Sequence, residues 1–159
     1  MYRINDYLIY KNEVVVVNDI LYSYKNNTDY YSLSILSDDS LRVKVPVDSL
    51  NIRTIISKKE LDDLIKKIPD IKIIDVDSKL LEYEYKKLLH TNKCEDLVKI
   101  IKTTYLRNKD RLDNNKKTTD KDMYYFNLSE RLMYQEVGVV LGISIDEARE
   151  YIVSKILAK

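Results

Sequence analysis

The chain has 159 residues, of which 45% are hydrophobic and 33% are charged, and its formal net charge is +1. This composition is typical of a folded, soluble protein and excludes an extensively disordered one. A net charge so close to zero does not by itself indicate binding to nucleic acid or to a membrane surface. The length accommodates one ordinary domain or two small ones.

The sequence carries no mark of export or of membrane insertion. It does not begin with the basic segment and apolar run that define a secretory signal. No apolar run approaches the roughly 18 residues of a membrane-spanning helix. The only cysteine, Cys94, cannot form an internal disulfide, which fits a reducing compartment. We therefore expect a cytoplasmic protein that does not enter a membrane.

The first third of the chain follows the two-residue period of β-strands. Val43, Val45 and Val47 alternate with Lys44 and Pro46, which indicates a strand with one apolar face. Glycine is absent from this region, and Asn and Asp are the residues that tolerate tight turns in its place. Hairpin loops are expected at residues 25–29 and 37–40.

These signals predict a small β-module of four strands. The module is a small twisted sheet or a partly open barrel. Because so small a sheet is near the lower limit of independent stability, we expect Leu50, Ile52 and the following helix to cover one of its ends. Strands are expected at residues 7–10, 14–24, 30–36 and 41–45.

From Ser57 onward the sequence follows the 3.6-residue period of α-helices. Ser57 with Glu60 and Ser144 with Glu147 have the spacing of capping boxes, and Thr119 is a further N-cap. Gly142 is expected to help end the helix that precedes it. Helices are expected at residues 57–67, 78–89, 94–111, 119–140 and 145–157.

The order of these elements predicts an α+β fold in which an N-terminal β-module precedes an all-helical C-terminal domain. Residues 1–55 form the module and residues 78–159 form the helical domain. Residues 56–77 contain a connecting helix and a linker, in which residues 71–76 are either an extended link or a single turn.

Few residues are arranged for catalysis or metal binding. His90 and Cys94 are four residues apart, but two ligands are too few for a structural zinc site, and residues 91–92 predict a helix break between them. Asp75 and Asp77 are more typical of a polar hinge than of paired catalytic carboxylates. The sequence has no glycine-rich phosphate loop and no nucleophile elbow. We expect no enzymatic activity, no cofactor and no metal site.

Tyrosine is unusually abundant, with fourteen residues beside one Phe and no Trp. Tyr22, Tyr24, Tyr30 and Tyr31 flank the first hairpin loop. They either form an aromatic protein-binding surface or are ordinary strand residues whose hydroxyl groups reach solvent. The sequence favours neither interpretation. Most tyrosines of the predicted helices are expected to pack in or beside the core, namely Tyr83, Tyr85, Tyr105, Tyr124 and Tyr125.

Basic charge is concentrated in the helical part of the chain. Residues 78–117 contain eleven Lys or Arg and six Asp or Glu, whereas residues 1–55 contain six and seven. A polyanion would therefore meet the helical part first, although a solvated helix face explains the same excess.

Five segments, taken in order, resemble the CarD/CdnL family of bacterial transcription regulators that bind RNA polymerase. The segments are residues 45–48, 56–60, 96–107, 132–137 and 140–147. No single segment is specific, but the ordered set covers about residues 1–155 without large insertions. The resemblance implies a Tudor-like β-module joined to a compact helical domain.

The resemblance also implies a function without catalysis. The β-module would lay a strand edge against the β subunit of RNA polymerase, and the two domains together would shift the equilibrium between closed and open promoter complexes. Lys44 holds the place of a basic residue that precedes the Val-Pro pair in family members. The polymerase-binding residues that the resemblance implies are Lys44, Lys25, Arg42 and Pro46.

Promoter DNA is the second partner that the resemblance implies, but the chain departs from the family there. Family members carry a tryptophan that wedges against the minor groove, and this chain has none. Asp75 and Asp77 stand in the corresponding region and would repel phosphate. DNA contact is therefore expected to be weak, electrostatic and sensitive to salt. The DNA-binding residues that remain are Lys79, Lys86, Lys87 and Lys93.

Two other functions stay open. The chain is alternatively an interaction module that binds polymerase or another protein and does not touch DNA. A small enzyme would need a polar pocket that brings together His90, Cys94 or the pair Asp75 and Asp77. The oligomeric state is also open, because a single short connector between two modules permits domain swapping.

Overall fold

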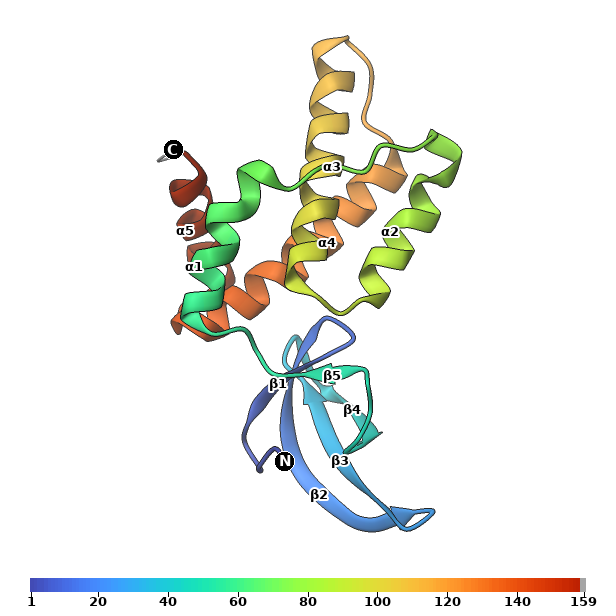
Figure 1. Ribbon diagram of the computed structural model, residues 1–159, viewed down its shortest axis with the longest axis vertical. Helices are drawn as coiled ribbons and strands as arrows, with labels where there is room; N and C mark the ends of the chain where they lie inside the picture. The colour runs from blue at the N-terminus through green and yellow to red at the C-terminus, as the bar shows by residue number, and fades with distance from the viewer. Residues whose placement is uncertain (158–159) are drawn as a thin grey trace. The chain divides into compact units, whose positions relative to one another are not determined.

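The protein consists of two compact units. The computed structural model describes residues 1–157, and its contacts separate Met1–Ile55 from Ile56–Lys159. The first unit contains a five-stranded antiparallel sheet, and the described part of the second contains five α-helices (Figure 1). The predicted α+β class is therefore confirmed.

The sheet pairs strands that are mostly consecutive in the chain. Its order is β4-β3-β2-β1-β5. The four strands that the pattern predicts are confirmed, and β5 is additional, because two residues are too few to show a period. The strands span Tyr7–Tyr10 (β1), Glu13–Lys25 (β2), Thr28–Ile35 (β3), Asp38–Pro46 (β4) and Ile52–Arg53 (β5).

Asparagine supplies the turn conformations that glycine provides in other sheets. Lys11 and Asn12, with φ of 47° and 70°, join β1 to β2. Asn26 and Asn27, with φ of 53° and 57°, join β2 to β3. Two central residues with positive φ define the type I′ turn, whose twist matches that of a hairpin. The predicted loop is confirmed in place but is shorter than residues 25–29, since only residues 26–27 lie outside the strands, and the expected use of asparagine is confirmed.

The second predicted loop is wrong in its position. β4 already begins at Asp38, which is paired with Ile35, so the connection is a two-residue turn at residues 36–37 rather than a loop over 37–40. Residues 39–41 are accommodated by a shift of register between the two strands. A bulge of this kind depends on cross-strand pairing, which the composition of the segment does not reveal.

The main hydrophobic cluster of the first unit lies on one face of the sheet, whereas Ile9 and Val14, which are also fully buried, project from the other face. Ile52 packs against this core, as expected. Leu50 does not cover the sheet, so that prediction is wrong: it lies in a turn and is 98% exposed. A turn that projects from the sheet leaves its side chain in solvent whatever its polarity. The buried residues of this core are Leu8, Val15, Val17, Tyr31, Leu33 and Val45.

The five predicted helices of the second unit are confirmed, and their ends follow the sequence signals. Ser57 and Glu60 form a capping box, as do Ser144 and Glu147. Gly142 ends its helix in the left-handed conformation with φ of 68°. The helices span Lys58–Lys67 (α1), Leu81–His90 (α2), Cys94–Asp113 (α3), Asp120–Leu141 (α4) and Ile145–Leu157 (α5).

Helices α3 and α4 run side by side at the centre of this unit (Figure 1). Leu61, Leu64 and Ile65 of α1 join the main core with residues of α3, α4 and α5. The connecting helix is therefore part of the helical unit. A smaller cluster beside α2 contains Leu81, Tyr85, Ile100 and Tyr125.

The segment between α1 and α2 crosses α3 and is held there by hydrogen bonds (Figure 1). The Lys102 ammonium donates to the carbonyl oxygens of Ile68, Pro69 and Ile71 at 2.9, 3.2 and 2.7 Å. Residues 71–76 form neither helix nor strand, which supports the extended link rather than the single turn. Two short 3-10 helices flank the link, at Ile68–Asp70 (η1) and Ser78–Leu80 (η2).

A buried polar network joins α2, α3 and α4. Asp122 is almost completely buried, and its two oxygens accept from the Tyr85 hydroxyl at 2.9 Å and from Arg107 Nε at 3.0 Å. Burial, the hydrogen bond to Asp122 and the charge of that carboxylate raise the pKa of the Tyr85 phenol. The phenol therefore remains a protonated donor throughout the neutral range.

Within residues 1–157, no helix has both the length and the apolar character needed to cross a membrane.

Candidate functional site

Strand β4 forms an open edge of the sheet. It pairs with β3 on one side and has no strand on its other side within the described chain. The opposite edge is formed by the two-residue β5 and by the far part of β2, because β1 pairs only with residues 13–16 of β2. β4 is therefore the strand whose whole length forms an edge of the sheet. An exposed edge carries unpaired backbone donors and acceptors, which is the property that allows a partner chain to add a strand.

The predicted polymerase-binding residues of β4 share one face of the strand. Arg42 and Lys44 stand opposite Ser34 and Ser32 of β3, and both side chains are exposed. Pro46 follows two residues later, at the end of the strand. The intervening Val45 points to the other face, where it is buried in the core. The two-residue period thus separates a polar outer face from an apolar inner one.

Lys44 contacts the tyrosines of the neighbouring hairpin. Its ammonium lies 5.1 Å from the centre of the Tyr24 ring and donates to the Tyr24 hydroxyl at 3.3 Å. The ring of Tyr24 in turn lies 5.3 Å from that of Tyr30. The basic residue and the aromatic residues, which are separate features of the sequence, therefore form one surface. We call Lys44, Tyr24 and Tyr30 the Lys44 patch.

The remaining predicted residues of this site lie beside the patch or at the hairpin tip. Arg42 donates from its guanidinium to Ser34 Oγ at 2.5 Å, which fixes its position on β4. Lys25 is exposed and directly precedes the turn at residues 26–27, so it belongs to the tip of the β2–β3 hairpin. No hydrogen bond or ion pair joins the Lys25 side chain to Arg42, Lys44 or Pro46.

The tyrosines of the hairpin divide between surface and core. Tyr22 and Tyr24 are exposed, whereas Tyr31 is buried with its ring against that of Tyr2, 5.9 Å between centres. The exposure of Tyr22 and Tyr24 is compatible with both interpretations, whereas the burial of Tyr31 excludes it from a binding surface in this conformation. The prediction for the helical tyrosines is wrong for three of the five, because their positions on the helices leave more than half of each residue in solvent. Those three are Tyr83, Tyr105 and Tyr124, which are 65%, 54% and 61% exposed.

All four predicted DNA-binding lysines are exposed on the helical unit. Lys79 lies in η2, and Lys93 is the N-cap residue of α3. Lys86 and Lys87 lie on α2, where Lys86 forms an exposed ion pair with Glu82 at 3.8 Å. Helical spacing places the exposed Tyr83 beside both of these lysines. The position of Tyr83, three and four residues before these lysines, is the sequence signal from which its place on this basic surface could have been predicted.

The residues considered for catalysis do not converge. His90 ends α2 and is exposed, whereas Cys94 begins α3 and is buried. The predicted break between them is confirmed by Asn92, whose φ is 58°. Asp77 caps η2 by accepting from the Lys79 backbone N–H at 3.2 Å. Across residues 1–157, the structure contains no group of three His, Cys, Asp or Glu side chains that could hold a metal ion.

No protein-family model matches the chain, and no curated protein matches it either. The fold and the site therefore define the class of protein by themselves. It is a two-unit α+β protein whose β-unit presents an open basic and aromatic strand edge and whose helical unit presents exposed lysines.

Proposed function

We propose that the protein is a transcription regulator of the CarD/CdnL type, acting in the cytoplasm. In this proposal the first unit is a Tudor-like module that binds the β subunit of RNA polymerase. The second unit contacts promoter DNA. A protein that binds the open promoter complex more tightly than the closed one, or the reverse, shifts the population toward the state it prefers.

The observation that carries the proposal is the open edge of β4. Backbone pairing along an edge supplies affinity, and side chains at alternate positions supply specificity. Arg42, Lys44 and Pro46 occupy such alternate positions. Charged residues and proline on an edge also protect a sheet from unwanted pairing, and this is the alternative that a binding measurement has to exclude.

The DNA contact in the proposal rests on the exposed lysines of η2, α2 and α3. Lysine ammonium groups neutralise phosphates without reading sequence, so the affinity depends on the release of counterions. The chain has no tryptophan to insert at a base step. The contact is accordingly electrostatic, and its strength falls steeply as salt rises.

Replacing Lys44 by glutamate is expected to weaken binding to the isolated polymerase β lobe by about tenfold or more. The substitution reverses a charge at the centre of the proposed interface and removes the cation from Tyr24. Biolayer interferometry with immobilised β lobe and the full chain measures the effect.

Lys11→Glu is the matched control for this experiment. Lys11 is also exposed and also lies over a tyrosine ring, 5.4 Å from the centre of Tyr10, but it belongs to the β1–β2 turn. Its replacement should leave the affinity within about twofold. Equal losses in the two variants, or no binding by the unaltered protein, would reject the proposed edge.

Removing the four predicted DNA-binding lysines is expected to flatten the salt dependence of DNA binding. The logarithm of the binding constant, plotted against the logarithm of salt concentration, should lose about one unit of slope for each phosphate contact removed. Fluorescence anisotropy with labelled promoter DNA provides the measurement. The residues changed to glutamine are Lys79, Lys86, Lys87 and Lys93.

A control with the same change of charge uses four other exposed lysines of the helical unit. The slope should remain unchanged in this control, because these residues lie outside the proposed interface. A similar reduction in both variants would mean that the contact follows overall charge and has no defined surface. The control residues are Lys58, Lys59, Lys116 and Lys117.

A second candidate function is a polymerase-binding or protein-binding module without DNA contact. Asp75 and Asp77 are both exposed just before η2, and their charge opposes the approach of phosphate there. Under this alternative the unaltered protein binds the β lobe but gives no salt-dependent DNA binding.

A further inference from the structure

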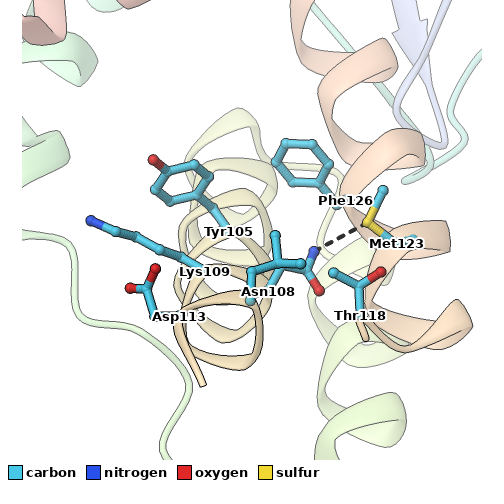
Figure 2. Close-up of a pocket in the computed structure, with 8 residues that line it drawn as sticks. Tyr105, Asn108, Lys109, Asp113, Thr118, Met123 and Phe126 are labelled. Carbon is cyan, nitrogen blue, oxygen red and sulfur yellow. Dashed lines mark hydrogen bonds between the residues drawn. The ribbon is translucent and has the colours of Figure 1, made fainter. Parts of the chain in front are cut away.

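The helical unit contains a surface cavity between the C-terminal half of α3 and the start of α4. Its volume is about 370 Å³, which lies within the range of small-molecule sites. Figure 2 shows Asn108 at the centre of the lining, between Tyr105 and Lys109 on one side and Met123 and Thr118 on the other. The lining is completed by Leu112, Asp113 and Phe126.

Asn108 is the unusual residue of this cavity. Its side chain is buried, and within residues 1–157 its oxygen Oδ1 has no hydrogen-bond partner. The amide nitrogen donates to Met123 Sδ at 3.4 Å, which is a weak acceptor. A buried amide oxygen without a partner destabilises a folded protein, so its presence calls for an explanation such as a bound ligand.

The walls of the cavity suit a flat ring. Tyr105 and Phe126 contribute aromatic side chains, and Leu112 and Met123 contribute apolar ones. Aromatic side chains stack on the bases of nucleic acids whatever their sequence. Asn108 Oδ1 is covered in this conformation, so base binding requires side chains of the cavity wall to move. Tyr105 and Leu112 of that wall are each more than half exposed.

We propose that this cavity binds an adenine base, with Asn108 as the residue that selects it. An asparagine amide offers one acceptor and one donor side by side, and adenine presents the matching amino group and ring nitrogen. Asn108 Oδ1 would accept from the adenine amino group, and the second hydrogen of Nδ2 would be donated to the adjacent ring nitrogen. Tyr105 and Phe126 would contact the faces of the ring.

The charges at the mouth favour recognition of the base over recognition of phosphate. Lys109 and Asp113 both line the cavity and carry opposite charges, so the mouth has no net charge. An indole from a partner protein would satisfy only Oδ1 and would leave the amide donor unused. The base belongs either to a free nucleotide or to an unpaired nucleotide of a strand, and these two sources share the chemistry proposed.

This inference does not depend on the proposed transcription function. The cavity contains none of the lysines assigned to DNA contact, and its binding is expected to change little with salt. Binding through the lysines of α2 would fall steeply with salt. A failure of one proposal is therefore distinguishable from a failure of the other.

Titration of the full chain with adenosine monophosphate (AMP), followed by NMR, tests the proposal. AMP should shift the side-chain amide signals of Asn108 and the methyl signals of Leu112. Inosine monophosphate (IMP) presents a carbonyl oxygen in place of the amino group. Its affinity should therefore be lower than that of AMP by about tenfold or more. A second titration uses short oligodeoxyadenylate, with oligothymidylate as its control. Whichever of AMP and oligodeoxyadenylate binds with the higher affinity identifies whether the base comes from a free nucleotide or from a strand.

Asn108→Leu should abolish the AMP-dependent shifts and raise the midpoint of thermal unfolding, because it removes the buried oxygen that lacks a partner. Tyr105→Ala provides a second test at an exposed position that does not threaten folding, and it should weaken AMP binding by about tenfold. Tyr124→Ala is the matched control, since Tyr124 is also more than half exposed, lies on α4 and does not line the cavity.

Three results would overturn the proposal. The first is the absence of AMP binding at millimolar concentration, and the second is equal binding of AMP and IMP. The third is a lower unfolding midpoint in Asn108→Leu together with unchanged AMP binding in Tyr105→Ala, which would mean that an ordered water satisfies Asn108.

Discussion

Asp122→Ala is expected to lower the free energy of unfolding of the helical unit by about 3–5 kcal/mol, because it leaves the partly buried Arg107 guanidinium without its partner. The substitution also frees the buried Tyr85 hydroxyl, which donates to the same carboxylate. Three helices meet at this group, so its loss affects the packing of each. Urea unfolding followed by far-ultraviolet circular dichroism, which reports mainly on the helices, measures the change.

Asp120→Ala is the control within the same first turn of α4. Asp120 is exposed, so only its interaction with the helix N-terminus is lost, at a cost of about 0.3–1 kcal/mol. Tyr85→Phe should have an intermediate effect of about 1.5–3 kcal/mol, since one hydrogen bond to a charged group disappears while the ring stays in place. A similar small effect in Asp122→Ala and Asp120→Ala would show that the network adds nothing to stability.

Leu33→Ala is expected to unfold much of the β-unit while the helical unit stays folded. Leu33 is fully buried at the centre of the sheet, and truncation of a core leucine costs about 2–5 kcal/mol. A unit of about 55 residues has a stability of roughly 3–8 kcal/mol, so this loss removes a large part of it. Amide NMR signals should collapse for Met1–Ile55 and persist for the described helices.

Leu41→Ala serves as the control, because Leu41 is half exposed on β4 and makes no contribution to the core cluster. The amide NMR signals of the Leu41→Ala variant should remain dispersed for all residues of the sheet. Leu33→Ala should also abolish binding to the polymerase β lobe without changing the salt dependence of DNA binding, which would separate the two proposed contacts. Loss of signals from both units together would mean that the chain unfolds as one cooperative body.

The ends of most elements were predictable because their signals are local. A capping box needs only Ser57 and Glu60, and the left-handed end of α4 needs only Gly142. Asparagine turns are read in the same way, since Asn26 and Asn27 set the backbone of the first loop directly. The predicted position of the second loop was wrong because the end of that loop depends on the register between β3 and β4. Register is a property of two strands and is not set by either one alone.

The candidate site was predictable as separate residues and not as a surface. Lys44 and Pro46 stood out by pattern and resemblance, whereas Tyr24, which contacts Lys44, is twenty residues away from it in the chain. The helical tyrosines show the same limit. Periodicity places Tyr83 and Tyr85 on α2, but only the packed structure decides that Tyr85 is buried and Tyr83 exposed.

The sequence by itself determined the α+β order of the elements, the helix caps and the asparagine turns, because each follows from the conformational preferences of residues a few positions apart. The tertiary structure alone decided which strand lies at the open edge, which tyrosines are exposed, and that Asp122 joins Tyr85 to Arg107. These features depend on contacts between residues far apart in the chain. Neighbouring residues in the sequence therefore do not indicate which side chains are buried or which strands are paired.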